Sequence, residues 1–169
     1  MSDTTLTLTA PSQTDRLFPT LTDAQVARIA ARGTRRQTAA GELLVEAGAH
    51  AVPFFVVVTG ELQVSDAAGA QIVRHRAGQF SGEVSMITGR PAVARTHVAK
   101  AGEVIELNRQ QLLTLVQTDA ELSAILMRAF ILRRLELIAR HVSDVVVLPV
   151  VTTCETTLLV AGSNVAVPA

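Results

Sequence analysis

The sequence predicts a mainly β fold, a barrel or sandwich flanked by helices, and three observations lead to this expectation. Between residues 34 and 107, glycines recur at intervals typical of turns, and the runs between them favour strands. A short segment before this region has the apolar spacing of an amphipathic helix. A long segment after it, residues 119–144, contains neither glycine nor proline and consists of good helix formers.

The composition indicates one folded domain with a sizeable core. The chain has 169 residues, of which 49% are hydrophobic and 18% charged, which excludes a disordered chain. Lysines and arginines equal aspartates and glutamates at 15 each, so the basic excess of a nucleic-acid binder is missing. The single cysteine, Cys154, excludes an internal disulfide and a cysteine-based zinc site, and it favours a cytoplasmic location. No apolar run approaches the roughly 20 residues of a membrane span, and residues 1–10 lack the features of a secretory signal.

The N-terminal elements are a tail and a helix. Residues 1–16 are polar and are expected to form a flexible tail. Thr22 can cap a helix, Val26 and Ile29 share one face of it, and Gly33 ends it.

The central region contains six strand-like runs separated by glycines. These runs are ELLVEAG, PFFVVVTGELQVSD, QIVRHRAG, GEVSMITG, ARTHVAKAG and EVIELN. Residues 66–69, DAAG, join two of the runs as a hairpin loop.

Residues 109–118 predict a short helix, and residues 119–144 predict a long helix with two apolar faces. One face should pack on the β region and consists of Leu122, Ile125, Ala129 and Leu132. The second seam consists of Ile131, Leu135, Ile138 and Val142. This seam packs either within the monomer or against its copy in a homodimer, and we favour the homodimer because little of the chain remains to cover it.

The C-terminal segment, residues 144–169, begins with DVVVLPVV, which has the composition of a buried strand. We expect it to be a truncated or non-native tail, or the start of a further domain. It contains no lysine or arginine, so we expect no helix-turn-helix domain and no DNA binding of that kind.

Three stretches carry a resemblance to a known family: GELLVEAG (residues 41–48), FFVVVTGELQV (54–64) and GQFSGEVSMITGRPAVA (78–94). Their glycines and apolar residues resemble those of the cyclic-nucleotide-binding domain family, which includes catabolite-activator-type regulators. The resemblance covers roughly residues 17–140. It implies an eight-stranded β-roll, a short N-terminal helix, a phosphate-binding cassette and a long C-terminal helix, so the domain should span residues 17–143.

In that family, the cassette combines Gly-Glu, a helical turn and Pro-Arg-Ser/Thr-Ala. The resemblance implies that the helix amides and the arginine hold the cyclic phosphate while the glutamate accepts a hydrogen bond from the ribose. Gly82, Glu83 and Pro91 match this pattern, but Ala92 stands in the arginine position and Val93 in the hydroxyl position. The expected cassette residues are Phe80, Ser81, Gly82, Glu83, Val84, Arg90, Pro91, Ala92 and Val93.

Some cassette residues admit two interpretations. Arg90 lies two residues before Ala92 and could replace the missing arginine, whereas Arg95 should point the other way. Both could equally be solvated surface residues. Glu83 could bind a ligand or hold the loop shape, and Gly82 is expected to serve the backbone conformation.

We therefore expect a regulatory, non-enzymatic module with a degenerate cassette that binds cyclic nucleotides weakly or not at all. Its candidate ligands are a cyclic nucleotide or another small phosphate, and we expect no cofactor. One alternative is a functional cyclic AMP or cyclic GMP regulator of the catabolite-activator type that lacks its DNA-binding domain. A second is a cupin-like metal enzyme using His75, His97 and Glu83, which the arginines on both sides of His75 and the histidine spacing disfavour. Residues 87–92 and 129–134 also resemble N-terminal domains fused to thioredoxin-reductase-like flavoproteins. We expect neither a metal site nor membrane association.

Overall fold

The computed structural model describes residues 12–140, which form eight strands and five helices. The elements follow the chain in the order α1 (Gln13–Leu17), α2 (Asp23–Ala30), β1 (Thr34–Thr38), β2 (Leu43–Val45), β3 (Phe54–Val57), β4 (Glu61–Ser65), β5 (Gln71–His75), β6 (Phe80–Ser81), α3 (Glu83–Thr88), β7 (Arg95–Lys100), β8 (Gly102–Leu107), α4 (Arg109–Thr118) and α5 (Ala120–Arg140). The mainly β fold with flanking helices is confirmed. The predicted C-terminal tail and the seam residue Val142 lie outside the described residues.

The strands form two four-stranded antiparallel sheets, with the orders β1-β8-β3-β6 and β2-β7-β4-β5. Strand β3 is buried on both faces, because alternate side chains enter two different cores. Phe55 and Val57 pack with residues of the second sheet in the interior of the roll. Phe54 and Val56 face the opposite way and pack with residues of the helices. The first sheet therefore separates the roll interior from a helical layer.

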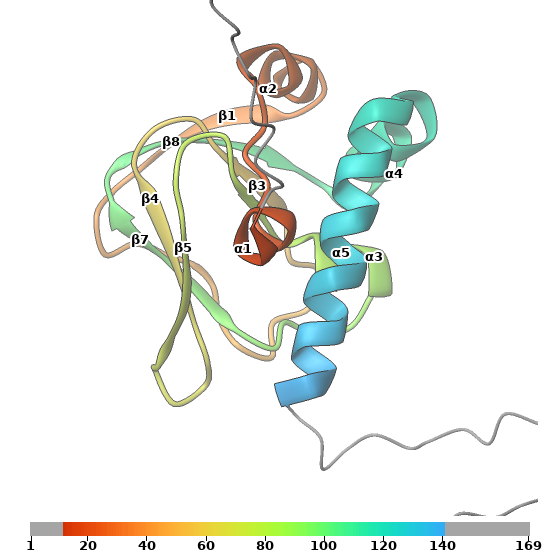
Figure 1. Ribbon diagram of the computed structural model, residues 1–169. Helices are drawn as coiled ribbons and strands as arrows, with labels where there is room; N and C mark the ends of the chain where they lie inside the picture. The colour runs from red at the N-terminus through yellow and green to blue at the C-terminus, as the bar shows by residue number, and fades with distance from the viewer. Residues whose placement is uncertain (1–11, 141–169) are drawn as a thin grey trace, which may run out of the picture.

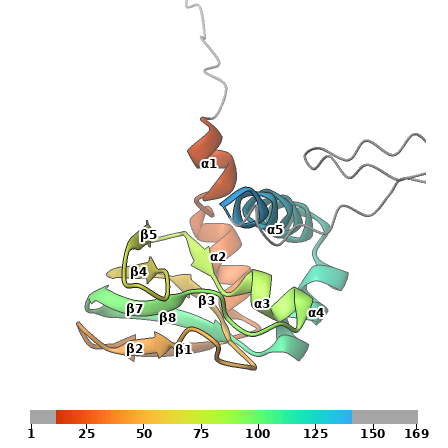
Figure 2. The ribbon, with the colours of Figure 1, turned by 90° about the horizontal axis from the view of Figure 1, so that it is seen from below.

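The helices form that layer on one side of the roll (Figure 1; Figure 2). Helix α5 runs along the roll, with Leu122, Leu126 and Ala129 completely buried against the core. Of the predicted inner face, Ile125 also packs against this core, but Leu132 is only half-buried. The centre of the buried face is therefore rotated toward Leu126, which the sequence analysis did not assign to it.

Side-chain caps define the starts of α2 and α4. In α4, the Asn108 side chain accepts a hydrogen bond from the Gln111 backbone amide at 2.9 Å, and the Gln111 side chain accepts one from the Asn108 backbone amide at 2.8 Å. Thr22 and Gln25 make the same reciprocal pair at the start of α2. Such capping boxes satisfy amides that have no partner within the helix, so these boundaries follow from local sequence.

Two expectations about secondary structure were wrong, and one strand was missed. Residues 13–16, assigned to a flexible tail, belong to α1, which is capped by Ser12 and contacts α5. The strand-like run GEVSMITG instead contains the helix α3. Strand β1, with the polar sequence TRRQT, was not among the predicted runs, and it forms because it pairs along its length with β8.

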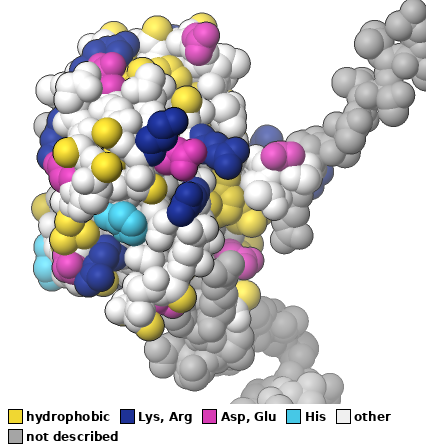
Figure 3. Space-filling view, turned by 90° about the vertical axis from the view of Figure 1, so that its left-hand side faces the viewer, with side chains coloured by type: hydrophobic (Ala, Val, Ile, Leu, Met, Phe, Trp, Pro, Cys, Tyr) yellow, Lys and Arg dark blue, Asp and Glu magenta, His cyan; other side chains and the backbone are white. Residues whose placement is uncertain are grey.

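The surface carries charges of both signs. On the face shown in Figure 3, the basic and acidic side chains are interspersed rather than gathered into one patch. Several of them pair with one another, including Arg35 with Glu103 at 3.0 Å. Among the described helices, none combines the length and the apolar character that crossing a membrane requires.

Candidate ligand-binding site

A cavity of about 640 Å³ lies between the roll, the segment around α3 and the end of α5. Its walls come from segments far apart in the sequence. Most lining residues are small or apolar, among them Val45, Val52, Val64, Val73, Ala92 and Leu137. A cavity of this size, within the range of roughly 300–1,000 Å³, suits a small organic molecule.

The cassette segment crosses the wall of this cavity at the junction between β6 and α3. Gly82 adopts a φ of 97° there, and a Cβ atom at this position would lie 2.2 Å from the carbonyl oxygen of Pro53. Only glycine fits this combination of positive φ and close backbone approach. The backbone therefore requires Gly82, in agreement with the conformational role expected for it.

Glu83 follows immediately and forms a buried ion pair with Arg133 of α5. Its Oε1 atom accepts a hydrogen bond from Arg133 Nη1 at 2.6 Å. Glu83 is 1% exposed and Arg133 is 8% exposed, so both charges are withdrawn from water. A buried carboxylate needs such a partner, since an isolated buried charge is strongly destabilising.

Arg133 makes several further contacts that hold it in place. Its Nε donates to the carbonyl oxygen of Leu17 at 2.8 Å, and its Nη1 donates to that of Phe80 at 3.2 Å. The guanidinium lies 4.8 Å from the ring centre of Phe18 and 4.7 Å from that of Phe80. One side chain thus connects α5 with α1, β6 and the cassette glutamate.

Three buried side-chain atoms near this pair have no hydrogen-bond partner among the described residues: Glu83 Oε2, Arg133 Nη2 and His75 Nδ1. His75 packs against the ring of Phe18, with ring centres 5.6 Å apart. Burial, together with the charge of Arg133, lowers the pKa of His75 from 6.5 to about 3. His75 is therefore neutral at physiological pH.

The loop after α3 carries the positions where the family motif has its charged and hydroxyl residues. Ala92 is buried, and its amide donates to the carbonyl oxygen of Ala49 at 2.9 Å. Val93 lines the cavity but presents no polar side-chain atom. The loop after α3 therefore contributes two apolar residues, Ala92 and Val93, to the lining of the cavity.

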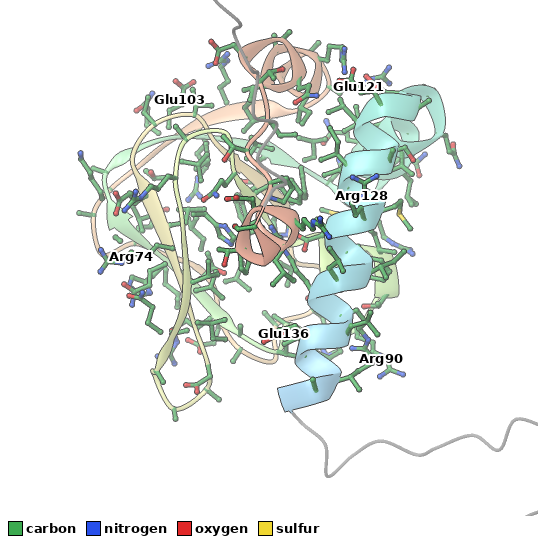
Figure 4. All side chains as sticks on the ribbon, viewed as in Figure 1. Arg74, Arg90, Glu103, Glu121, Arg128 and Glu136 are labelled. Atoms are coloured by element: carbon green, nitrogen blue, oxygen red, sulfur yellow. The ribbon has the colours of Figure 1, made fainter. Side chains whose placement is uncertain are left out.

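The two arginines considered as replacements lie elsewhere. Arg90 is exposed and is not among the residues that line the cavity. Figure 4 shows Arg90 and Glu136 on opposite sides of the lower part of α5. Arg95 forms an ion pair with Glu46 at 2.7 Å and also lies outside the lining. Neither supplies a cation to the cavity in this conformation.

The structure brings most of the predicted cassette together. The cavity lining includes Ser81, Gly82, Glu83, Val84, Ala92 and Val93. Phe80 is completely buried behind it, and Arg90 and Pro91 are exposed outside it. Among the described residues, no group of three or more histidines, cysteines or carboxylates could hold a metal ion.

Sequence analysis missed Arg133. A signal for it exists, because Leu122, Leu126 and Ala129 recur every third or fourth residue, and the next position on this stripe is Arg133. A charged residue in line with a buried stripe indicates a buried partner of opposite charge.

Comparison with protein families matches residues 35–119 to the cyclic nucleotide-binding domain. No curated protein sequence matches the chain. Among solved structures, one from work on a cyclic-GMP-dependent signalling pathway in bacterial phytopathogenesis is 28% identical. The match covers 69% of this chain and 96% of that one, with a TM-score of 0.62.

Two further structures share the fold. The catabolite activator protein of Thermus thermophilus is 20% identical with a TM-score of 0.60, and the match covers 76% of this chain and 62% of that protein. The N-terminal domain of a transcriptional regulator from Streptomyces coelicolor A3(2) is 22% identical with a TM-score of 0.53, and the match covers 76% of this chain and 94% of that domain.

Proposed function

Because the chain belongs to the cyclic nucleotide-binding domain family, we propose that it is a regulatory ligand-sensing module whose phosphate cassette is degenerate. The observation that carries the proposal is the pair of apolar residues, Ala92 and Val93, at the positions of the phosphate-binding arginine and hydroxyl. Glu83, which the family resemblance assigns to the ribose, is already paired with Arg133. Both anchoring points for a cyclic nucleotide are therefore altered.

The expected consequence is weak or undetectable binding of cyclic AMP and cyclic GMP. A hydrogen bond to a charged group contributes about 1.5–3 kcal/mol, and each 1.4 kcal/mol corresponds to about a tenfold change in affinity. Losing the arginine alone should thus weaken binding by at least one to two decades. The phosphate would also lose water on entering without gaining a cation.

Calorimetric titration of the full chain with cyclic AMP and cyclic GMP tests the proposal. The double substitution Ala92→Arg with Val93→Thr should create measurable affinity for one of them, whereas Val93→Thr alone should not. Circular dichroism must show that the variant stays folded, because Ala92 belongs to the core. A folded double variant that binds neither nucleotide would show that the cavity differs in more than these two groups.

The alternative is a functional cyclic-nucleotide regulator. Its support is the 28% identity to the structure from the cyclic-GMP-dependent pathway. Micromolar binding of either nucleotide by the wild type would favour this alternative and contradict the degenerate cassette. In that case Arg90→Ala should be measured first, since Arg90 is the exposed arginine nearest in sequence to Ala92 and forms no ion pair within residues 12–140.

We also propose that α5 mediates a homodimer. Ile131, Leu135 and Ile138 lie on one stripe of the helix and are 51%, 57% and 38% exposed, which is unusual for side chains of this size. Sedimentation should show a dimer at tens of micromolar. Ile138→Glu should dissociate it, and Ala139→Glu, which adds the same charge beside the stripe, should not. A monomeric wild type at that concentration would contradict the dimer.

A further inference from the structure

The charges in the cavity restrict the chemistry of its ligand. Five residues of the lining can ionise: Asp66, His75, Glu83, Arg133 and Glu136. Among these described lining residues, only Arg133 is a lysine or arginine. Asp66 and Glu136 are carboxylates, and the buried His75 is neutral.

The single cation is not available to a ligand. Arg133 already donates to Glu83, to Leu17 and to Phe80, and it is enclosed by two aromatic rings. Its remaining nitrogen, Nη2, is buried from solvent and has no hydrogen-bond partner among residues 12–140. Because Nη2 is buried, an anion could contact it only if the surrounding side chains moved. Drawing the guanidinium away from Glu83 would leave that carboxylate buried without a counter-charge, which is strongly unfavourable.

The remaining walls favour an apolar molecule with a few neutral polar groups. Valines from the roll and Leu137 from α5 provide apolar surface, and the hydroxyls of Ser81 and Ser85 lie in the same lining. Hydroxyls can donate or accept hydrogen bonds without a charge on the ligand. A few polar groups on an apolar wall are the usual way in which such cavities orient a ligand.

We propose that the cavity binds an uncharged organic molecule with a largely apolar body, and that it discriminates against anions of the same shape. This inference rests on the proposed ligand-sensing function and specifies the class of ligand. It differs from binding of any phosphate, because it assigns the ligand's main contacts to the apolar walls rather than to the cassette.

Two fluorescent probes of nearly the same shape test the proposal on the full chain. N-phenyl-1-naphthylamine is uncharged, and 8-anilinonaphthalene-1-sulfonate is the same molecule with a sulfonate. The uncharged probe should saturate at one site per chain and bind at least about tenfold more tightly than the sulfonate. Equal or tighter binding of the sulfonate, or no saturable binding of the uncharged probe, would overturn the proposal.

Variants locate the binding site. Val73→Trp places a large side chain in the lining and should abolish binding of the uncharged probe, whereas Gln71→Trp, on an exposed position of the same strand, should preserve it. Retained binding in a folded Val73→Trp variant would place the probe elsewhere and overturn the proposal. Ala92→Arg adds a positive charge to the lining and should shift the preference toward the sulfonate by at least about tenfold. An unchanged preference in a folded variant would contradict the charge argument.

Titration with cyclic AMP separates this inference from the proposed function. A wild type that prefers the sulfonate but does not bind cyclic AMP would overturn the inference and leave the degenerate cassette intact. A wild type that binds cyclic AMP at micromolar concentration would overturn the degenerate cassette itself, and with it the ligand class proposed here.

Discussion

Replacing Arg133 with methionine should lower the free energy of unfolding by about 3–5 kcal/mol, because it leaves the Glu83 carboxylate buried without its partner. Methionine reaches about as far as the arginine Nε and is unbranched, so it keeps the packing of the arginine stem. The loss therefore arises mainly from the ion pair and from the two backbone carbonyls, those of Leu17 and Phe80, that lose a donor.

Two further variants separate these contributions. Arg133→Lys keeps the positive charge but lacks the planar guanidinium that donates to three acceptors. Its loss in the free energy of unfolding should therefore be intermediate. The double variant Glu83→Met with Arg133→Met removes both charges, and it should be more stable than the sum of the two single losses predicts by at least about 2 kcal/mol.

Urea unfolding at neutral pH measures these differences, with all variants at the same protein concentration so that association does not distort the comparison. A folded Arg133→Met variant within about 1 kcal/mol of the wild type would refute the reasoning, since that is the range of an exposed ion pair. Additive single losses in the double variant would show that Glu83 and Arg133 are not coupled.

Three further predictions concern stability. The pKa of His75 is lower in the folded chain (about 3) than its usual 6.5, so the unfolded chain binds the proton first and stability falls as pH drops from 6.5 toward 3. Between these pH values, the free energy of unfolding should change by up to about 1.4 kcal/mol per pH unit, and this change should be smaller by that amount in His75→Phe. Urea unfolding at several pH values measures both slopes. Gly82→Ala should cost at least about 2 kcal/mol in thermal or urea unfolding, because its Cβ would meet the Pro53 carbonyl. Asn108→Ala should cost about 1 kcal/mol through loss of the α4 cap, and Gln110→Ala at an exposed position of that helix should be nearly neutral.

Local sequence was sufficient where local interactions decide the structure. Residues 109–118 were predicted as a helix and α4 has these bounds, because the cap at Asn108 and the hydrogen bonds within the helix are all local. The hairpin loop at residues 66–69 follows for the same reason, since Asp66 accepts a hydrogen bond from the Ala70 amide. The glycine spacing predicted the strand-rich region because several glycines in the connections of this region adopt a positive φ, as at Gly60.

Local sequence failed where distant segments decide the structure. The run GEVSMITG is rich in strand-forming residues, but α3 begins there because Gly82 takes a left-handed conformation and lies against Pro53, about thirty positions earlier in the sequence. Strand β1 has no apolar alternation and forms only through its pairing with β8. Helix α1 is short and polar, and the carbonyl of its last residue is held by Arg133.

The candidate site illustrates the same division between local and distant information. The motif placed Gly82, Glu83 and Ala92 at one cavity, because residues of one short segment remain near one another in any fold of the family. It could not assign a partner to Glu83, since that partner lies 50 residues away on another element. In the function that we propose, the absence of an arginine at Ala92 is therefore only half of the altered chemistry. The other half is Arg133 of α5, which pairs with the carboxylate that the family resemblance assigns to the ribose. Only the folded structure brings Arg133 and Glu83 together.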